Sequence, residues 1–409
     1  MQQLKQETSE VAANEVAETR EKLARLGAAH IALPPRFDFN QVDPVHIADV
    51  APEPPPDLGP LVDFVGAWQG NGFNTIFRPD NPQTPTPLPI PAGGDNVLEL
   101  NLTAESLSFS PSLGSVPNRG EVQGDVFLNG VPYLQTISDV TAGQPVGIHV
   151  EPGLWMAVPS TTDPAEPTQT LVRMGSIPHG TTILAQGTAS TTAGPPSIPP
   201  VDITPFISSN PVLRIRFPSQ TASAQGTARI PQDLTNVPIT QAMLDDPNSV
   251  LRDAIANQHI DATTTITIST SPTQPLFGGG ADNIAFLLGF PGAVTNPNNA
   301  GQNAQTVVMN ATFWIETVEH TIVIPPFPEP PEGPIELQPE GQTPEVPVPT
   351  FIAHPPVPIP RPHPITIRTK QIQYSQTVIL NFNGLSWPHV SVATLVPAGS
   401  IPVPGGWPT

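Results

Sequence analysis

Apolar and polar residues alternate in short runs along most of the chain, and Pro, Gly or Asn bounds these runs. Alternation with a period of two is typical of half-buried β-strands, whose successive side chains point to opposite faces. Thr, Val and Ile, which favour pleated surfaces, dominate the runs. The pattern predicts strands over residues 97–110, 146–158, 169–175, 181–189, 211–217, 259–270, 306–324, 366–382 and 388–396. The sequence therefore predicts an all-β protein with predominantly antiparallel strands.

The first residues follow a helical pattern instead. Residues 3–27 carry an imperfect apolar stripe, with no Pro or Gly before Gly27, a residue typical of helix C-termini. We expect one amphipathic helix there, either an exposed arm or a helix through which copies of the chain form homo-oligomers. An extended linker follows over 34–60. On this pattern, residues 1–57 are an N-terminal helix and linker, and 58–409 are one large β domain.

Two later segments also depart from the strand pattern. Pro247 precedes the run VLRDAIAN, which predicts a short internal helix over 247–258. Residues 325–364 contain 16 prolines in 40 residues, and proline cannot donate to a strand ladder. Because strand-like sequence resumes at Ile365, this stretch is predicted to be a polyproline-like insertion between two strands of one sheet.

Composition and charge narrow the function classes. The 409 residues include 58 Pro and 31 Gly, and an interior proline destabilises a helix by about 3 kcal/mol, so a mainly helical protein is disfavoured. There are 15 Lys and Arg against 35 Asp and Glu, a formal charge of −20. Such a surface repels phosphate backbones, so we expect no nucleic-acid partner. The absence of cysteine removes disulfides and cysteine-based zinc sites.

The sequence contains no sign of a membrane span or a secretory signal, and it lacks two common catalytic motifs. No apolar run reaches the roughly 18 residues of a membrane span, and the N-terminus has neither a basic segment nor an apolar core of a secretory signal. A cytoplasmic protein is the expectation. The sequence contains no phosphate-binding G-x-x-x-x-G-K motif, and no G-x-S-x-G motif of α/β-hydrolases.

A hairpin is predicted near the C-terminus. Asn383-Gly384 lies between two apolar runs and indicates a two-residue type I′ turn, which fixes the strand register. The register pairs Phe382 with Leu385, Leu380 with Trp387, Val378 with His389, Gln376 with Ser391 and Tyr374 with Ala393. These side chains share one face. His389 therefore has small neighbours on one side, which leaves room for a flat ligand; the alternative is a hydrogen-bonded core histidine.

Four segments carry a family resemblance. They are Gly66-x-Trp68-x-Gly70-x-Gly72, His149-x-Glu151-x-Gly153, the turn Pro178-His179-Gly180-Thr181, and PHVSVATL at 388–395. In order and character they resemble the nitrobindins, haem-binding β-barrels of the calycin type. The resemblance implies an antiparallel barrel of about ten strands, enlarged by insertions, because nitrobindin domains are much shorter. A barrel of this size encloses a lumen large enough for haem.

The resemblance also implies a function. Ferric haem b would be held by His389 as the metal ligand, and Trp68, Trp155, Tyr374, Val378 and Trp387 would line the cofactor. His179, Thr181 and His149 would act at the sixth coordination position. The substrate would be nitric oxide, peroxynitrite or peroxide, in the manner of a peroxynitrite isomerase or a peroxidase.

Other interpretations remain open from the residues alone. The barrel could bind an apolar small molecule without metal, as lipocalins do, or the chain could be a structural or assembly protein. His149 and Glu151 could form a hydrogen bond that closes the barrel, or bind a non-haem metal together with His179. His320, which follows a buried-looking strand, is a further candidate for lining the pocket.

Overall fold

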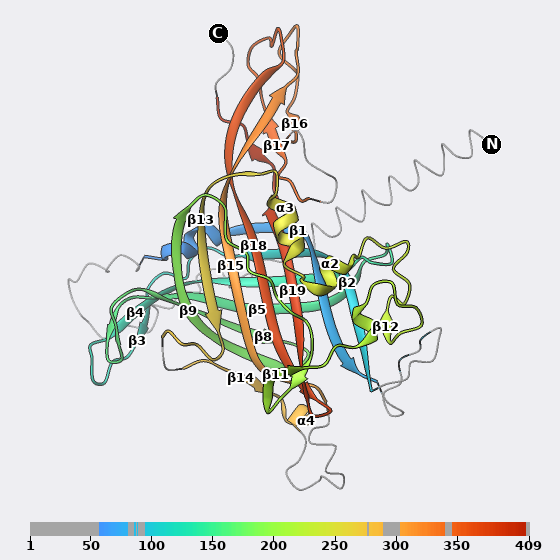
Figure 1. Ribbon diagram of the computed structural model, residues 1–409. Helices are drawn as coiled ribbons and strands as arrows, with labels where there is room; N and C mark the ends of the chain where they lie inside the picture. The colour runs from blue at the N-terminus through green and yellow to red at the C-terminus, as the bar shows by residue number, and fades with distance from the viewer. Residues whose placement is uncertain are drawn as a thin grey trace.

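The computed structural model describes residues 57–80, 86, 88, 95–275, 278–288, 303–339 and 346–405. Ten strands pair antiparallel in one ring, and the first strand of the ring pairs with the last (Figure 1). In ring order they are β1 (Gly66–Pro79), β2 (Asn96–Phe109), β4 (Val126–Asp139), β5 (Val146–Val158), β8 (Thr170–Ile177), β9 (Thr181–Ala193), β13 (His259–Ser269), β15 (Gln305–Ile324), β18 (His363–Phe382) and β19 (Leu385–Pro397). The predicted all-β barrel of about ten strands is confirmed.

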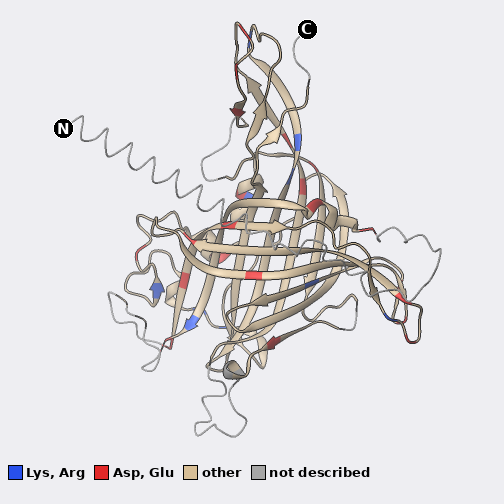
Figure 2. Ribbon diagram, turned by 180° about the vertical axis from the view of Figure 1, so that it is seen from behind, with Lys and Arg blue, Asp and Glu red and all other residues tan. Residues whose placement is uncertain are grey.

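The short elements lie outside this ring. They are β3 (Val116–Asn118), β6 (Thr161–Thr162), β7 (Ala165–Glu166), β10 (Phe206–Ile207), β11 (Asn210–Arg214), β12 (Arg229–Ile230), β14 (Gly280–Asn283), β16 (Ile335–Leu337), β17 (Phe351–Ala353), β20 (Ile401–Pro402), η1 (Gly59–Phe64), η2 (Pro218–Gln220), α2 (Gln241–Asp245), α3 (Ser249–Ile255) and α4 (Ala285–Leu288). Charged residues are sparse along the barrel strands (Figure 2).

Most predicted strands lie where the alternation placed them, with three differences. The strand predicted over 211–217 is the five-residue β11, which pairs with β10 and is not part of the ring. Neither β1 nor β4 was among the predicted strands. In β4, Gly130 and Pro132 interrupt the alternation and are typical of loops. The helix predicted over 247–258 is present as α3.

The lumen of the barrel contains the first apolar core. This lumen cluster includes Trp68, Tyr133, Trp155, Phe313 and Tyr374, all at most 4 % exposed. Its members alternate along their strands with outward-facing residues, as the period of two requires. The helix η1 adds Phe64, whose ring stacks on Phe109 with a centroid distance of 4.6 Å. The lumen cluster therefore fills one part of the barrel with aromatic rings.

A second core, the outer cluster, covers the outer face of β1, β2 and β19. Phe73, Leu98 and Val392 point outward from these strands and pack against apolar residues of the segment 194–258. Helices α2 and α3 belong to this segment, and Figure 1 shows them lying against the barrel wall beside β1 and β19. The central part of the sequence is thus a cover on the barrel and not a separate core.

One arginine holds the turns of this cover together. Arg229 is fully buried, and its guanidinium donates hydrogen bonds to six backbone carbonyls. The acceptors belong to Ser219, Thr221, Ala222, Ala224, Pro231 and Gln232. A planar group with five N–H donors can satisfy many carbonyls of an irregular loop at once.

β15 and β18 continue beyond the barrel as a long two-stranded ribbon (Figure 1). The proline-rich segment connects their far ends, because Ile324 pairs with His363, as expected for an insertion between two strands. The expectation that it supplies no ladder bonds is wrong for two proline-free triplets: β16 pairs with β17, which also pairs with β20. Phe351 of β17 packs on Ile322 and Ile367 of the ribbon.

The helix predicted over 3–27, and the linker up to residue 56, lie outside the described residues. Among the helices that are described, none has the length and apolar character required to cross a membrane.

Candidate functional site in the barrel lumen

The C-terminal hairpin has the predicted register. Asn383 and Gly384 both have positive φ, 49° and 76°, as a type I′ turn requires. Val378 lies opposite His389, and Tyr374 lies opposite Ala393. Because Val378, Tyr374 and Ala393 belong to the lumen cluster, this register places His389 on the lumen face of β19.

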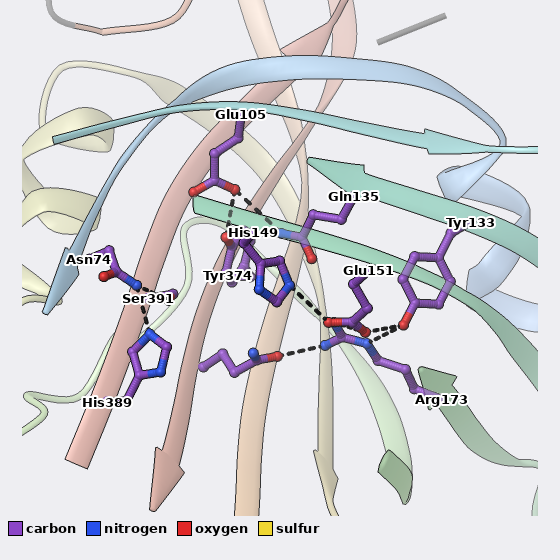
Figure 3. Close-up of polar contacts among 11 residues, drawn as sticks. Asn74, Glu105, Tyr133, Gln135, His149, Glu151, Arg173, Tyr374, His389 and Ser391 are labelled. Carbon is purple, nitrogen blue, oxygen red and sulfur yellow. Dashed lines mark hydrogen bonds and ion pairs between the residues drawn. The ribbon is translucent and has the colours of Figure 1, made fainter. Parts of the chain in front are cut away.

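His389 is held by an amide on the neighbouring strand. The Nδ2 of Asn74 on β1 lies 2.8 Å from Nε2 of His389 and 2.7 Å from the hydroxyl of Ser391 (Figure 3). The Oδ1 of Asn74 accepts a hydrogen bond from Asn101 at 3.2 Å, which orients the amide. An amide nitrogen only donates, so Nε2 is the acceptor and carries no proton. His389 is therefore a neutral imidazole with its proton on Nδ1.

Burial keeps His389 neutral, and two other histidines add to the effect. Burial, with the charges of His149 and His179, lowers the pKa of His389 to about 3. The rings of His149 and His179 lie 5.7 Å apart. Burial and the neighbouring His149 lower the pKa of His179 as well, although a hydrogen bond to the Ile148 backbone opposes this. Strands β5 and β19 and the turn before β9 thus bring three imidazoles near one another.

A buried ion pair lies beside His149. Arg173 on β8 donates to Oε1 of Glu151 at 2.7 Å, and the two side chains are 2 % and 0 % exposed. Tyr133 donates its hydroxyl hydrogen to the same oxygen and accepts from Nε of Arg173 at 3.0 Å. Gln376 accepts from Nη1 of Arg173 at 2.8 Å. Burial alone would raise the pKa of Glu151, but the charge of Arg173 outweighs it and lowers the pKa to about 2.

A second buried carboxyl group, that of Glu105 on β2, forms no ion pair with any residue in the described part of the chain. Its Oε2 accepts the hydroxyl hydrogen of Tyr374 at 2.6 Å and an amide hydrogen of Gln135 at 3.4 Å. Thr103 donates to Oε1 at 3.0 Å. Burial raises the pKa of Glu105 to about 7, although these hydrogen bonds lower it. Near neutral pH, Glu105 can therefore hold or release a proton.

The glycine of the H-x-E-x-G segment has a steric explanation. A Cβ on Gly153 would lie 2.4 Å from the ring of Tyr133, and a Cβ on Gly175 would lie 2.4 Å from Oε1 of Glu151. Both glycines face the lumen opposite each other on β5 and β8. They leave the space that Tyr133 and Glu151 occupy.

The structure brings most of the predicted site residues together. Val378, Tyr374, Trp68 and Trp155 belong to the lumen cluster. His149 lies 3.3 Å from Oε2 of Glu151, so the hydrogen bond left open by the sequence is present. These residues form the core of the candidate site, and Figure 3 shows His149, Glu151 and Tyr374 among them.

Three predicted residues lie apart from this group or at its edge. Trp387 belongs to the outer cluster, where its ring stacks on Phe382 with a centroid distance of 4.5 Å. Thr181 donates to Asn283 of β14 at 2.9 Å. His320 lies on the ribbon, where Nε2 is 2.9 Å from Thr369 and the ring packs near Phe351. His320 lines a different pocket of about 180 Å³, with His259 and Glu319.

Sequence reasoning found Glu151 but missed two other charged members of the site, Glu105 and Arg173. Glu105 shares the lumen face of β2 with the buried Leu107 and Phe109, and Arg173 shares its face of β8 with the buried Leu171, so each charge stands next to apolar core positions. That anomaly is a usable signal, because a charge in a core is normally paired. Asn74 gave no such signal.

Comparison with known proteins adds one structural likeness. No family model matches the chain, and no curated protein matches it. The crystal structure of Rv2717c from M. tuberculosis is similar at 11 % sequence identity, with a TM-score of 0.30, over 84 % of this chain and 100 % of that chain. The strand pairing of the chain itself defines a ten-stranded antiparallel β-barrel.

Proposed function

We propose that the lumen binds ferric haem b and that His389 Nε2 is the axial ligand. The observation that carries the proposal is a neutral imidazole on the lumen face whose Nε2 has no proton. A neutral imidazole nitrogen is the donor that haem iron takes from histidine. The amide of Asn74, which now donates to Nε2, would keep its bond to Ser391 when the iron replaces it.

The surroundings of His389 suit a flat aromatic ligand. Ser391 and Ala393 follow it along the lumen face of β19, and Gly70 and Gly72 stand beside them on β1. The aromatic rings of Tyr374 and Trp155 belong to the same lumen. The small residues leave space beside the ligand histidine. The aromatic residues farther along provide a surface on which a porphyrin can pack.

The polar residues would act on the side away from His389. A bound ferric haem supplies a Lewis-acidic, redox-active iron. His179 is neutral, so its ring can accept a proton from an incoming ligand or return it. Glu151 fixes His149 by a hydrogen bond, and Arg173 fixes Glu151. We propose nitric oxide, peroxynitrite or a peroxide as the substrate, with His149, His179 and Thr181 controlling access, in an isomerase or peroxidase reaction.

The test is a haem titration of the purified full-length chain, followed by its Soret absorption. We expect saturable binding in the wild type and its loss in His389→Ala. His320→Ala is the matched control: it removes another buried, neutral imidazole, whose pKa burial lowers to about 4, but outside the lumen. Binding by His389→Ala as tight as by the wild type would overturn the ligand assignment.

The aromatic lumen cluster favours a second candidate, a metal-free barrel that binds an apolar molecule. A wild-type protein that shows no Soret shift but enhances the fluorescence of an apolar dye would support it.

A further inference from the structure

Both tyrosines of the chain lie in the lumen, each on a buried carboxylate. The sequence contains two tyrosines, and Tyr133 and Tyr374 are 1 % and 2 % exposed. Tyr133 donates its hydroxyl hydrogen to Glu151, and Tyr374 donates to Glu105 at 2.6 Å. A phenol that is hydrogen-bonded to a base loses an electron more easily, because its proton can leave at the same moment.

The two pairs differ in the base that they offer. Glu151 accepts from Arg173, whose positive charge makes this carboxylate a poor proton acceptor. Among the described residues, no cation is bonded to Glu105. Burial raises the pKa of this carboxyl group to about 7. The groups that face Glu105 are Tyr374 from β18, Gln135 from β4 and Thr103 from its own strand, with the charge of His149 from β5 acting at longer range.

A chain of aromatic rings connects the two tyrosines through the core. Tyr374 stacks on Phe313 with centroids 5.4 Å apart, and Phe313 lies 5.2 Å from Trp155. The chain continues from Trp155 to Phe64 at 5.4 Å, from Phe64 to Phe109 at 4.6 Å and from Phe109 to Tyr133 at 5.9 Å. The two tyrosines therefore belong to one continuous aromatic core.

We propose that Tyr374 and Glu105 form a one-electron donor within the barrel. In the step, the O–H bond of Tyr374 breaks, its proton moves to Oε2 of Glu105, and its electron passes to a one-electron oxidant. Nitrogen dioxide, which peroxynitrite yields, is an oxidant of this class and is reduced to nitrite. The products are a neutral tyrosyl radical, a protonated Glu105 and nitrite, so charge and atoms balance.

The identity of this oxidant rests on the proposed function, whereas the donor pair does not. The experiment therefore uses the haem-free full-length chain and hexachloroiridate(IV), a one-electron oxidant that needs no cofactor. The radical is trapped by freeze-quenching and identified by its electron paramagnetic resonance spectrum, and its rate of formation is followed by stopped flow.

We expect a tyrosyl radical in the wild type and in Tyr133→Phe, and its loss in Tyr374→Phe. Below pH 7 the rate should fall about tenfold per pH unit as Glu105 becomes protonated. Glu105→Gln should slow the reaction and abolish this pH dependence, which a merely structural hydrogen bond would not do. Circular dichroism and thermal melting check that each variant is folded.

Two results would overturn the proposal: a radical of equal yield in Tyr374→Phe, or no tyrosyl radical in the folded wild type. Neither depends on haem. A protein that fails the haem titration but forms the Tyr374 radical refutes the proposed function alone, and the converse result refutes the donor pair alone.

Discussion

Asn74 on β1 and His389 on β19 are 315 positions apart in the chain, yet the amide of the first donates to Nε2 of the second at 2.8 Å. The amide fixes both the tautomer and the direction of the imidazole. It also competes with any metal for the same lone pair.

Replacing Asn74 should change haem affinity in a direction that depends on the new side chain. Asn74→Asp puts an acceptor beside Nε2, which favours a proton on that nitrogen and opposes ligation. A shift of one pKa unit corresponds to about 1.4 kcal/mol, so we expect haem binding weaker by about tenfold or more. Asn74→Leu is the control, because it removes the donor without adding an acceptor. Equal affinities in the two variants would show that the tautomer of His389 does not matter.

Stability should reach a plateau between about pH 4.5 and 6.5. Burial lowers the pKa of His320 to about 4 from its ordinary 6.5. Between these two values the unfolded chain binds more protons than the folded chain, so stability falls as the pH drops from 6.5 to 4. Burial raises the pKa of Glu316 to about 8 from its ordinary 4.5, so the folded chain binds more protons and stability falls as the pH rises. His389 follows the behaviour of His320, because burial lowers its pKa, and Glu105 follows that of Glu316, because burial raises its pKa. Between the two ordinary values the effects oppose each other.

Urea unfolding of the haem-free protein from pH 4 to 9 measures this dependence. Glu316→Gln, which cannot ionise, should lose less stability between pH 6.5 and 8 than the wild type. An alkaline slope that is the same in both proteins would show that Glu316 is not protonated in the folded state.

Removing Arg229 should detach the cover from the barrel. Arg229→Ala leaves six backbone carbonyls of the cover without their donor, and each unsatisfied buried group costs about 1–3 kcal/mol. We expect a loss of more than about 3 kcal/mol and rapid proteolysis within 194–258. Arg216→Ala is the control, since its pair with Asp245 is half exposed and is expected to contribute less than about 1 kcal/mol.

Gly175→Ala should disturb the ion pair of Glu151 and Arg173 although neither of these two residues is replaced. The new Cβ would lie 2.4 Å from Oε1 of Glu151 and 2.8 Å from the hydroxyl of Tyr133, so these groups must move. Overpacking of this kind costs about 1–3 kcal/mol. Gly147→Ala, where a Cβ meets no atom within 4 Å, should be neutral in the same chemical denaturation experiment. Similar stability of both variants would mean that the lumen can expand around Glu151.

The sequence could predict those features of the fold that depend on residues close together in the chain, namely the strands and the register of the last hairpin. Asn383-Gly384 determined every pair of the last hairpin, and the period of two placed most of the barrel strands. Alternation also grouped Trp387 with His389, but the ring of Trp387 stacks between Phe382 and Phe217 in the outer cluster. Phe217 comes from a distant segment, so no local pattern could show that it would be there.

The polar part of the site was predictable only in fragments. His149 and Glu151 are two residues apart on one strand, and their contact follows from alternation. The contact of Glu105 with Tyr374 joins positions 269 residues apart, on two strands that do not pair with each other and whose side chains meet across the lumen. Such pairs are set by barrel closure, which a single sequence does not specify.

The pairing of β1 with β19 determines when the site can exist during synthesis. The ring closes between the first barrel strand and the last, with Trp68 opposite Pro397, so a growing chain cannot complete the barrel until its C-terminal residues have been made. Contacts between such distant segments slow folding and leave strand edges exposed meanwhile. Asn74 and His389 lie on the two sides of this seam, so the proposed ligand is oriented only once β1 and β19 have paired. A chain truncated before residue 385 would have neither a closed wall nor a site.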